Sequence, residues 1–510
     1  MRKHIFRVVS LILCLALSLG VAMQITVNKQ SYEMSGWQLT EKDKADALFF
    51  GTSYVHYGIL CGELWEQNGI PAYNCGADGQ NIDVTYWAIR NALDYVTPKV
   101  IVVDIFSTSW SWIEKATVED FHNTLDWAPW SKTKFELMRT LPKNQRLEMM
   151  FPFLHYHSRW EELKKSDFVK ENHIFGGTSY SGVERQLKQD IVSKNEMGDV
   201  KDFMLQAVED IITYCKNRDI QVVFTVMPGS HTPSQQRTLN TVIALGKKYG
   251  VETIDLHDFD VVDAKTDFYD MRNMGNDATA SHINFSGAKK VTRFLGNWLQ
   301  ENYDLKDRHG ESGYENWEEK ENLYRQEKTT ELAKEGSLSG LLVRLADKDY
   351  STVVMIPAGS HIEKDGQTKA LLQNLGLDPD FDRIQTECYL GIADTYRDRT
   401  IELWGQGEYT WRDQDGNVLA SVGFDGDLQE KKYTNPGIVC NGEDYSLRTY
   451  NDVDAQPIAA DIQVLALENQ SGKVVCSKGY DQLPREWEYR PVAIGQEQEK
   501  GIVVDDENAL

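Results

Sequence analysis

Basic residues are scarce in this chain of 510 residues. Its 54 Lys and Arg stand against 78 Asp and Glu, which leaves a formal net charge of −24. Binding of nucleic acid depends on clusters of Lys and Arg that neutralise phosphates. So acidic a balance argues against a nucleic-acid partner and is compatible with solubility at a crowded surface. Hydrophobic residues still make up 41%, so the composition is that of a globular protein rather than a disordered one.

Cysteine is also infrequent, with seven residues in the chain, none of which shows C-x-x-C or Cys/His metal-binding spacing. We therefore expect the cysteines to be small buried hydrophobic residues. A Cys61–Cys75 or a Cys440–Cys476 disulfide stays open as an alternative. The Asp and His residues between Asp255 and Asp263 are expected to form a solvated loop, with a metal site as the less favoured alternative, and no metal site is predicted.

Long apolar runs are absent from the sequence except near the N-terminus. Arg2, Lys3 and Arg7 precede an uncharged apolar run at 8–23, which is the pattern of a signal peptide or an N-terminal signal anchor. The run is short against the roughly 20 residues of a membrane-spanning helix. Both hypotheses place the rest of the chain outside the cytoplasmic membrane, either membrane-anchored by its N-terminus or secreted.

Strands and helices are expected to alternate from residue 46 to about residue 303. Apolar strands are predicted at 47–50, 72–74, 100–106, 221–227 and 252–256, and helices at 53–68, 81–95, 201–217, 234–249 and from 285 onward. Strands that are apolar throughout are typical of a parallel sheet buried on both faces. The alternation predicts βαβ units, and hence an α/β domain with a parallel sheet at 28–305.

Five further segments complete the predicted organisation. Residues 107–200, rich in Trp, Phe and His, are expected to be a mostly helical insertion beside the sheet. Residues 306–337 are highly charged and predict a helical linker. Residues 338–485 contain short strands and Asp-Gly turns, which indicate a second, strand-rich α+β domain. An acidic tail follows at 486–510, and the signal peptide or anchor occupies 1–27.

Ser53 and His282 are the residues best placed for chemistry. Ser53 lies at a predicted strand-to-helix turn, where helix N–H groups can stabilise an oxyanion. His282 precedes the last predicted helix, and histidine can accept a serine proton near neutral pH. In a parallel α/β fold the two positions can meet at one edge of the sheet. Taken singly, an N-cap serine and a loop histidine are the more ordinary interpretations.

Three blocks of sequence resemble, in order and spacing, those of SGNH (GDSL-like) hydrolases. They are Phe50-Gly51-Thr52-Ser53 with Gly58, then Asn74-Cys75-Gly76, and finally Ser281-His282-Ile283-Asn284-Phe285-Ser286-Gly287-Ala288. The resemblance covers roughly residues 46–303 and implies a three-layer αβα sandwich. It implies Ser53 as nucleophile, His282 as base, and an oxyanion hole formed by N–H groups of Ser53 and Gly76. It requires no metal or organic cofactor.

Within that superfamily the chain is similar to the DltD-like branch, whose membrane-anchored extracytoplasmic members take part in acyl modification of cell-surface polymers. The segment 153–160 also resembles that branch and is expected near the site. His231 follows the strand at 221–227 and either borders the pocket or is a turn histidine. The candidate pocket residues are Tyr54, Asn74, His157, Arg159, His231 and Asp270.

Two departures from the family pattern matter. The aspartate expected three residues before the histidine is replaced by Thr279. Asp277 is therefore assigned to orient His282, with Asp270 and a Ser–His dyad as alternatives. The family also has a third block, between the second and the last of those quoted above, and its Asn is an oxyanion donor in hydrolytic members. This Asn has no match at 102–107, although the DltD-like branch commonly lacks that block. A weak or inactive site is thus an open alternative.

The second domain resembles the interleukin-like EMT inducer domain over most of 338–484. The resemblance rests on a terminal hairpin at 461–481 and on earlier segments at 353–356 and 388–392. It implies a β-sandwich-like module that recognises ligands such as glycans. A domain that serves only packing is the plainer interpretation.

The sequence therefore predicts an extracytoplasmic serine esterase or acyltransferase that acts on acyl groups of a cell-surface or exported polysaccharide. The resemblance implies a membrane acyltransferase as partner, and the N-terminal segment implies contact with the membrane. The rival hypothesis is a catalytically degenerate glycan-binding or scaffold protein of the cell envelope. Hydrolysis and transfer use the same residues, so the sequence leaves them open, together with the acyl group and the polymer.

Overall fold

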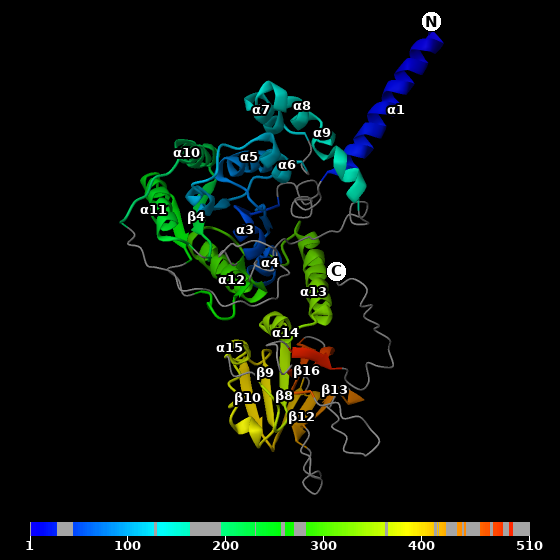
Figure 1. Cartoon of the computed structure of the whole chain (residues 1–510), viewed down its shortest axis with the longest axis vertical. Helices are drawn as coiled ribbons and strands as arrows, with labels where there is room; N and C mark the ends of the chain where they lie inside the picture. Colours follow the sequence, from blue (N-terminus) through cyan, green and yellow to red (C-terminus); the bar gives the residue numbers. More distant parts are fainter. Residues whose placement is uncertain are drawn as a thin grey trace.

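The computed structural model contains an N-terminal helix, an α/β domain and a strand-rich second domain (Figure 1). It describes residues 2–27, 44–126, 130–163, 195–229, 231–256, 261–269, 282–362 and 366–412, with shorter segments at 416, 418–424, 436–440, 443–444, 460–469, 473–482 and 489–492. This architecture confirms the predicted fold class, an α/β domain with a parallel sheet followed by a second domain rich in strands.

A five-stranded parallel sheet of order β2-β1-β3-β4-β5 forms the centre of the α/β domain. The strands are β1 Ala47–Phe50, β2 Ala72–Asn74, β3 Val100–Asp104, β4 Gln221–Val226 and β5 Glu252–Asp255. Every residue of β1, β2 and β3 is buried, which explains why their sequences are apolar throughout. The strand order reverses between β1 and β3, and ligands of such folds bind at the carboxyl ends of the strands at that point.

Helices cover both faces of this sheet (Figure 1). They are α3 Ser53–Gly58, α4 Cys61–Asn68, α5 Ile82–Ala92, α10 Asp202–Lys216, α11 Pro233–Lys248 and α12 Phe285–Asn302. α4 contacts α12, and α5 contacts α10. Right-handed crossovers in this strand order place these two pairs on opposite faces. The single helix expected at 53–68 is wrong in one respect, because the chain breaks it into α3 and α4.

The described part of the segment 107–200 is helical, as the sequence predicts. It contains α6 Val118–Leu125, α7 Lys132–Thr140, α8 Lys143–Met150, α9 Phe153–Tyr156 and the 3-10 helix η3 His157–Glu162, after a 3-10 turn η2 Phe106–Ser109 that ends β3. α7 and α8 lie at the end of the molecule nearest the N-terminal helix (Figure 1).

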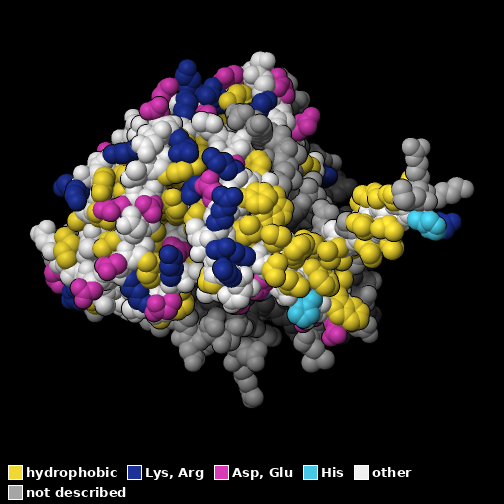
Figure 2. Space-filling view, turned by 90° about the horizontal axis from the view of Figure 1, so that it is seen from above, with side chains coloured by type: hydrophobic (Ala, Val, Ile, Leu, Met, Phe, Trp, Pro, Cys, Tyr) yellow, Lys and Arg dark blue, Asp and Glu magenta, His cyan; other side chains and the backbone are white. Residues whose placement is uncertain are grey.

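The N-terminal helix α1 runs from Arg2 to Thr26 and projects away from the α/β domain (Figure 1). Its segment His4–Met23 is long and apolar enough to cross a membrane, by length and composition, and none of it is buried in the protein. A signal sequence has the same properties. Figure 2 shows hydrophobic side chains gathered on the face beside this helix.

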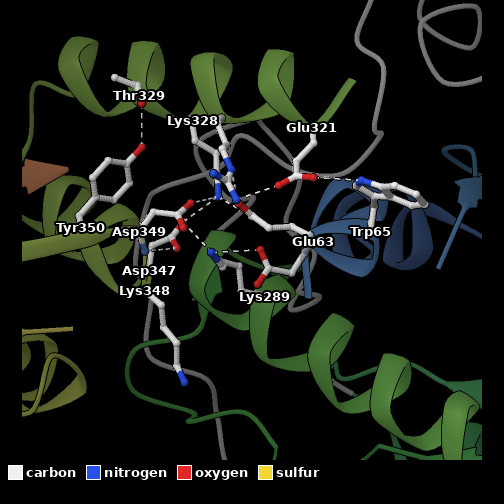
Figure 3. A network of polar contacts seen from close by, with 12 residues as sticks. Glu63, Trp65, Lys289, Glu321, Lys328, Thr329, Asp347, Lys348, Asp349 and Tyr350 are labelled. Carbon is white, nitrogen blue, oxygen red and sulfur yellow. Dashed lines mark hydrogen bonds and ion pairs between the residues drawn. The ribbon is translucent and has the colours of Figure 1, made fainter. Parts of the chain in front are cut away.

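The charged segment after the α/β domain forms a helix, α13 Glu315–Lys334, one side of which packs on α4. Trp317 is fully buried, and Lys328 forms ion pairs with Glu66, Asp347 and Asp349. Figure 3 shows this network, in which α13 lies above residues of both domains. Charge composition alone predicts an exposed helix, and most of α13 is exposed or half-buried; one stripe is buried, formed by Trp317, Tyr324, Leu332 and the paired cation Lys328.

Two sheets face one another in the second domain. The larger has the order β10-β9-β8-β15-β16-β17 and the smaller β11-β12-β13-β14. The strands are β8 Tyr350–Ile356, β9 Tyr389–Asp394, β10 Arg399–Trp404, β11 Glu408–Arg412, β12 Val418–Phe424, β13 Pro436–Cys440, β14 Glu443–Asp444, β15 Ile462–Glu468, β16 Val474–Gln482 and β17 Tyr489–Val492. Val353 and Met355 of β8 pack in one cluster with Tyr409 and Val422 of the smaller sheet. The opposite face of β8 joins the core that includes α14 Leu338–Leu345 and α15 Gln367–Asn374.

Both cysteines of the suggested Cys61–Cys75 bridge are free and buried. Cys476 is also free, whereas the side chain of Cys440 lies outside the described residues. The expectation of small buried cysteines therefore holds for both members of the first pair.

Candidate active site

The structure brings Ser53 and His282 together. His282 Nε2 lies 2.8 Å from Ser53 Oγ, although 229 positions separate the two residues. Ser53 is the first residue of α3 and follows β1, at the carboxyl edge of the sheet. His282 lies on the short strand β7, His282–Ile283, which pairs with β6, Phe268–Tyr269. A hydrogen bond between a hydroxyl and an imidazole is the arrangement that activates a serine nucleophile.

Close packing of α3 on α12 and on β7 holds the two side chains in place. Gly58, at the end of α3, leaves no room for a side chain: a Cβ there would lie 2.7 Å from Met227 Cε and 3.1 Å from Ile283 Cδ1. Thr292 of α12 accepts a hydrogen bond of 3.0 Å from the N–H of Leu60. The glycine of the first sequence block therefore serves the approach of α3 to the strand that carries His282.

Asn74, predicted to line a pocket, is buried and forms hydrogen bonds with the end of α3. Its Nδ2 donates to the carbonyl oxygens of Val55, His56 and Ile59 at 2.8, 3.1 and 2.9 Å. Its Oδ1 accepts the N–H of Gly76 at 3.0 Å. The amide satisfies carbonyls that a helix end leaves free, so it ends α3 at the position where the sequence predicted a continuous helix.

The N–H of Gly76 is therefore not presented as a free oxyanion donor, because Asn74 Oδ1 already accepts it. A Cβ at Gly76 would lie 2.8 Å from the backbone nitrogen of His56, so this glycine serves close packing under α3. Ser53 differs in that its N–H, in the first turn of α3, donates no hydrogen bond within the described part of the chain. Of the two predicted donors, Ser53 is the one the structure leaves available.

Burial controls the charge state of His282. It lowers the pKa of His282 to about 4, an effect that nearby Asp78 partly offsets by raising it and that His56 reinforces. The ring stacks on Tyr54 at a centroid distance of 4.7 Å and meets the edge of Tyr57 at 5.4 Å. The imidazole is thus neutral at pH 7 and able to accept a proton.

The partner of the second imidazole nitrogen is not settled by the described residues. Within them, His282 Nδ1 is buried and has no hydrogen-bond partner. The predicted orienting residues Asp277 and Asp270 both lie in the segment 270–281, which is outside the described residues. In the sequence that segment lies between β6 and β7, so both acids come shortly before His282 in the chain.

Asp78 is a site residue that the sequence analysis missed. It accepts a hydrogen bond of 2.8 Å from Tyr57 Oη and lies 3.4 Å from His56 Nδ1. Burial raises its pKa, but these contacts with His56 and Tyr57, and the nearby His282, outweigh burial and lower it overall. Its position just after β2, at the same sheet edge as Ser53, is the signal that could have identified it.

Asp104, unlike the exposed Asp78, is a buried acid that the sequence analysis left without a role. It ends β3, and its Oδ1 accepts the N–H of Met227 at 3.1 Å. Burial raises its pKa to about 7, although the backbone hydrogen bonds it accepts act in the opposite direction. Its charge in turn raises the pKa of Tyr54, an effect secondary to the burial of that phenol. Asp104 thus belongs to the packed wall behind the site.

The remaining pocket predictions divide into two groups. Tyr54 stacks on His282, and His231 connects to it through Phe106, which stacks on His231 at 4.6 Å and meets Tyr54 edge-on at 4.7 Å. By contrast, Arg159 Nη1 donates to the carbonyls of Thr26 and Val27 at the end of α1.

The placement of the segment 153–160 near the site is therefore wrong. His157 is exposed and hydrogen-bonds the carbonyl of Leu154 within its own segment. Among the described contacts, none joins His157 or Arg159 to Ser53 or His282. Both residues belong to the surface beside α1, because their helices pack against the end of α1 rather than on the sheet.

One group in the described part of the chain has the composition of a metal site. His122, Glu148 and His155 each offer one ligand atom, and these atoms lie within 4.8 Å of one another. Asp126 lies 2.7 Å from one nitrogen of His122, and Glu148 lies 3.2 Å from one nitrogen of His155. The group lies in the helical insertion, and two ordinary carboxylate–histidine pairs account for most of its contacts.

Comparison with known proteins adds little to this geometry. No family model matches the chain, and no curated protein matches it in sequence. Among solved structures, the 2.00 Å crystal structure of a candidate acylhydrolase from Bacteroides fragilis NCTC 9343 matches 52% of this chain and 93% of its own, at 11% identity and a TM-score of 0.25. Similarity at this level identifies no family, so the function has to be argued from the side chains themselves.

Proposed function

We propose that the α/β domain is a serine esterase or acyltransferase of the SGNH type, with Ser53 as nucleophile and His282 as base. The observation that carries the proposal is the 2.8 Å contact between Ser53 Oγ and His282 Nε2 at the carboxyl edge of a parallel sheet. A buried, neutral imidazole that contacts a serine hydroxyl at the point where the strand order reverses can accept the serine proton and activate the hydroxyl as a nucleophile.

In the proposed reaction Ser53 Oγ attacks the carbonyl carbon of an ester, and its proton passes to His282 Nε2. The oxyanion receives the N–H of Ser53, while the N–H of Gly76 can contribute only by sharing or leaving Asn74 Oδ1. Collapse of the tetrahedral intermediate breaks the ester bond, and His282 returns the proton to the departing alcohol. Water or a second hydroxyl then attacks the acyl-enzyme, which gives hydrolysis or transfer respectively.

Asp277 is proposed to orient His282 through Nδ1, with Asp270 as the alternative and a Ser–His dyad as the third possibility. The support is indirect: Nδ1 is buried and has no partner among the described residues, and both acids precede His282 in the sequence, between β6 and β7. A carboxylate there would stabilise the imidazolium that forms as Ser53 loses its proton.

The proposed substrate is an acylated polysaccharide of the cell surface or one being exported. α1, long and apolar enough to cross a membrane, supports retention at the outer face of the membrane as a signal anchor. The resemblance to the DltD-like branch supports an acylated polymer and a membrane acyltransferase partner. The sandwich-like second domain is proposed to recognise glycan, by its resemblance to the interleukin-like EMT inducer domain.

The rival proposal is a degenerate hydrolase fold that binds glycan without catalysis. One observation favours it: the N–H of Gly76 is already accepted by Asn74, and the third-block Asn is missing, so Ser53 supplies the one predicted donor that is free in the described chain. An oxyanion hole with a single donor loses about 3 kcal/mol of transition-state stabilisation relative to a complete one.

A fluorophosphonate probe separates the two proposals. We expect labelling of the full-length protein and a loss of about 10³-fold or more in labelling rate for Ser53→Ala and for His282→Gln. Ser107→Ala is the matched control, because Ser107 is also buried and close to the end of β3 but lies outside the Ser53–His282 contact. A folded wild-type protein that is not labelled would overturn the enzyme proposal, and glycan binding by that protein would support the rival.

A further inference from the structure

A ridge of exposed apolar side chains runs along the helical insertion. Leu147 lies on α8, Phe151 directly follows that helix, Leu154 lies on α9 and Trp160 lies on η3. Their exposed fractions are 58%, 37%, 52% and 64%. We call these four residues the apolar ridge. Single exposed apolar residues are ordinary, but large ones gathered together mark a contact surface.

The apolar ridge lies at the end of α1. Arg159, next to Trp160 in the chain, donates from Nη1 to the carbonyl oxygens of Thr26 and Val27 at 2.8 and 3.0 Å. Both α9 and η3 contact α1. Figure 2 shows hydrophobic side chains continuing from the body of the protein toward the projecting helix. The members of the ridge on α9 and η3, Leu154 and Trp160, therefore belong to helices that contact α1.

The position of α1 determines what the ridge faces. The segment His4–Met23 has the length of a membrane span, and Thr26 follows it by three residues. If this segment crosses the bilayer, Thr26 and Val27 lie at the membrane surface, since a helix rises about 1.5 Å per residue. Residues that contact them, including Arg159 and its neighbours on α9 and η3, then lie at the depth of the lipid headgroups.

We propose that the apolar ridge inserts into the interfacial layer of the bilayer that α1 spans. This inference rests on the proposed anchoring by α1 and goes beyond it, because it assigns a second membrane contact. Tryptophan and leucine are the residue types that such interfacial segments bury. A bilayer is favoured over a protein occupant because the helices of the ridge contact α1, which alone among the described helices is long and apolar enough to cross a membrane.

The charged residues near the apolar ridge are of both signs. Arg139 at the end of α7 and Lys143 at the start of α8 are exposed, and so are Glu161 and Glu162, which directly follow Trp160. The apolar side chains, and not a basic patch, therefore carry the proposal. A second contact also restricts rotation about α1, so the site is held at a constant height above the membrane.

The test uses the full-length chain in lipid vesicles, on a Cys14→Ser background that removes the exposed thiol of α1. Leu154→Cys carries a small fluorophore, and Tyr396→Cys is the matched control. Tyr396 is also exposed, at 48%, but lies in the turn between β9 and β10 of the second domain. Lipids brominated near the interface act as quenchers, and vesicle flotation reports anchoring separately.

We expect about a twofold loss of fluorescence for the probe at Leu154→Cys, from a depth of roughly 5–10 Å, and no loss at Tyr396→Cys. Quenching without any other protein present excludes a protein partner as the occupant. Flotation of the chain with an unquenched Leu154→Cys probe would overturn the ridge proposal and leave the anchor intact. A chain that does not float would overturn both.

Discussion

Lys289 of the α/β domain and Asp347 of the second domain form a buried ion pair, with Lys289 Nζ 2.5 Å from Asp347 Oδ2 (Figure 3). Each side chain is only 2% exposed, and Lys289 also lies 3.1 Å from Glu63 Oε2. Lys289 belongs to the first part of α12, which begins three residues after His282. The second domain is thus joined to the helix that directly follows the proposed base.

Removing the cation from this pair should destabilise the protein strongly. Lys289→Met preserves most of the side-chain volume but leaves the carboxylates of Glu63 and Asp347 buried with one fewer partner. Burial by itself raises the pKa of Asp347, and Lys289 and Lys328 outweigh it and hold that pKa well below its usual range. We expect a loss of about 3 kcal/mol in the free energy of unfolding by urea, the lower end of the range for a broken buried pair, because Lys328 and Arg293 remain.

Lys334→Met is the control for that substitution. Lys334 pairs with Glu331, and both lie on α13, but the side chain of Lys334 is 68% exposed. We expect a change within about 0.5 kcal/mol. Equal effects of the two substitutions would show that the buried contact does not hold the domains together.

The burial of His282 predicts a specific dependence of stability on pH. Its pKa falls from the ordinary 6.5 to about 4 in the folded protein. Between these values the unfolded chain binds a proton that the folded chain does not, so stability decreases as the pH falls through this window. His282→Gln should remove up to about 3 kcal/mol of that decrease. Urea unfolding of both proteins at pH 7 and pH 4 measures it, and parallel pH profiles would contradict the prediction.

The fold was predictable because its signals are local. A continuous apolar run such as 100–106 identifies a buried strand, and the helix stripes identify the layers that cover the sheet. The break between α3 and α4 was not predictable, because it depends on Asn74, which follows β2 and reaches back to the carbonyls of α3. The packing of α13 was equally hidden, since its charges are neutralised by partners on α4 and in the second domain.

Of the candidate site, only the residues that lie in recognisable sequence motifs were predictable. The family blocks named Ser53 and His282, and the structure brings them into contact. Asp78 was missed because no motif contains it; only the pairing of β1 with β2 reveals that it shares an edge with Ser53. Arg159 was misplaced because a resemblance over eight residues does not show where in the fold the segment lies. Its partners are backbone carbonyls at the end of α1.

Asp78 should act as a positioning residue for His282. Its charge raises the pKa of His282 and so stabilises the imidazolium formed during the reaction. Asp78→Asn is expected to lower kcat/KM for a simple aryl ester by about tenfold, equivalent to roughly 1.4 kcal/mol. It should also move the acid limb of the pH profile to lower pH. Tyr57→Phe, which keeps the charge of Asp78 but removes its 2.8 Å hydrogen bond, should leave that limb in place. An unmoved limb in Asp78→Asn would show a purely structural role.

Asn74 gives the sharpest test of how α3 is held, because one amide both donates to three carbonyls and accepts the N–H of Gly76. Asn74→Ala removes both functions, and we expect a loss of about 2 kcal/mol in the free energy of unfolding, in the range for buried groups left without a partner. The labelling of Ser53 by the fluorophosphonate should also slow, because Ser53 begins the same helix.

Asn74→Asp separates the two functions of the amide. It keeps the shape and the acceptor for Gly76, but it turns a carboxylate oxygen toward the three carbonyls in place of the Nδ2 donor. Repulsion between these oxygens should make the aspartate variant less stable than the alanine variant, and thermal unfolding of the two proteins decides the order. If the aspartate variant is the more stable one, then acceptance of the Gly76 N–H holds the turn under Ser53, and the hydrogen bonds to α3 contribute little. The order of the two melting temperatures therefore also shows how strongly the Gly76 N–H is held by the side chain at position 74, and hence how readily it can turn to an oxyanion.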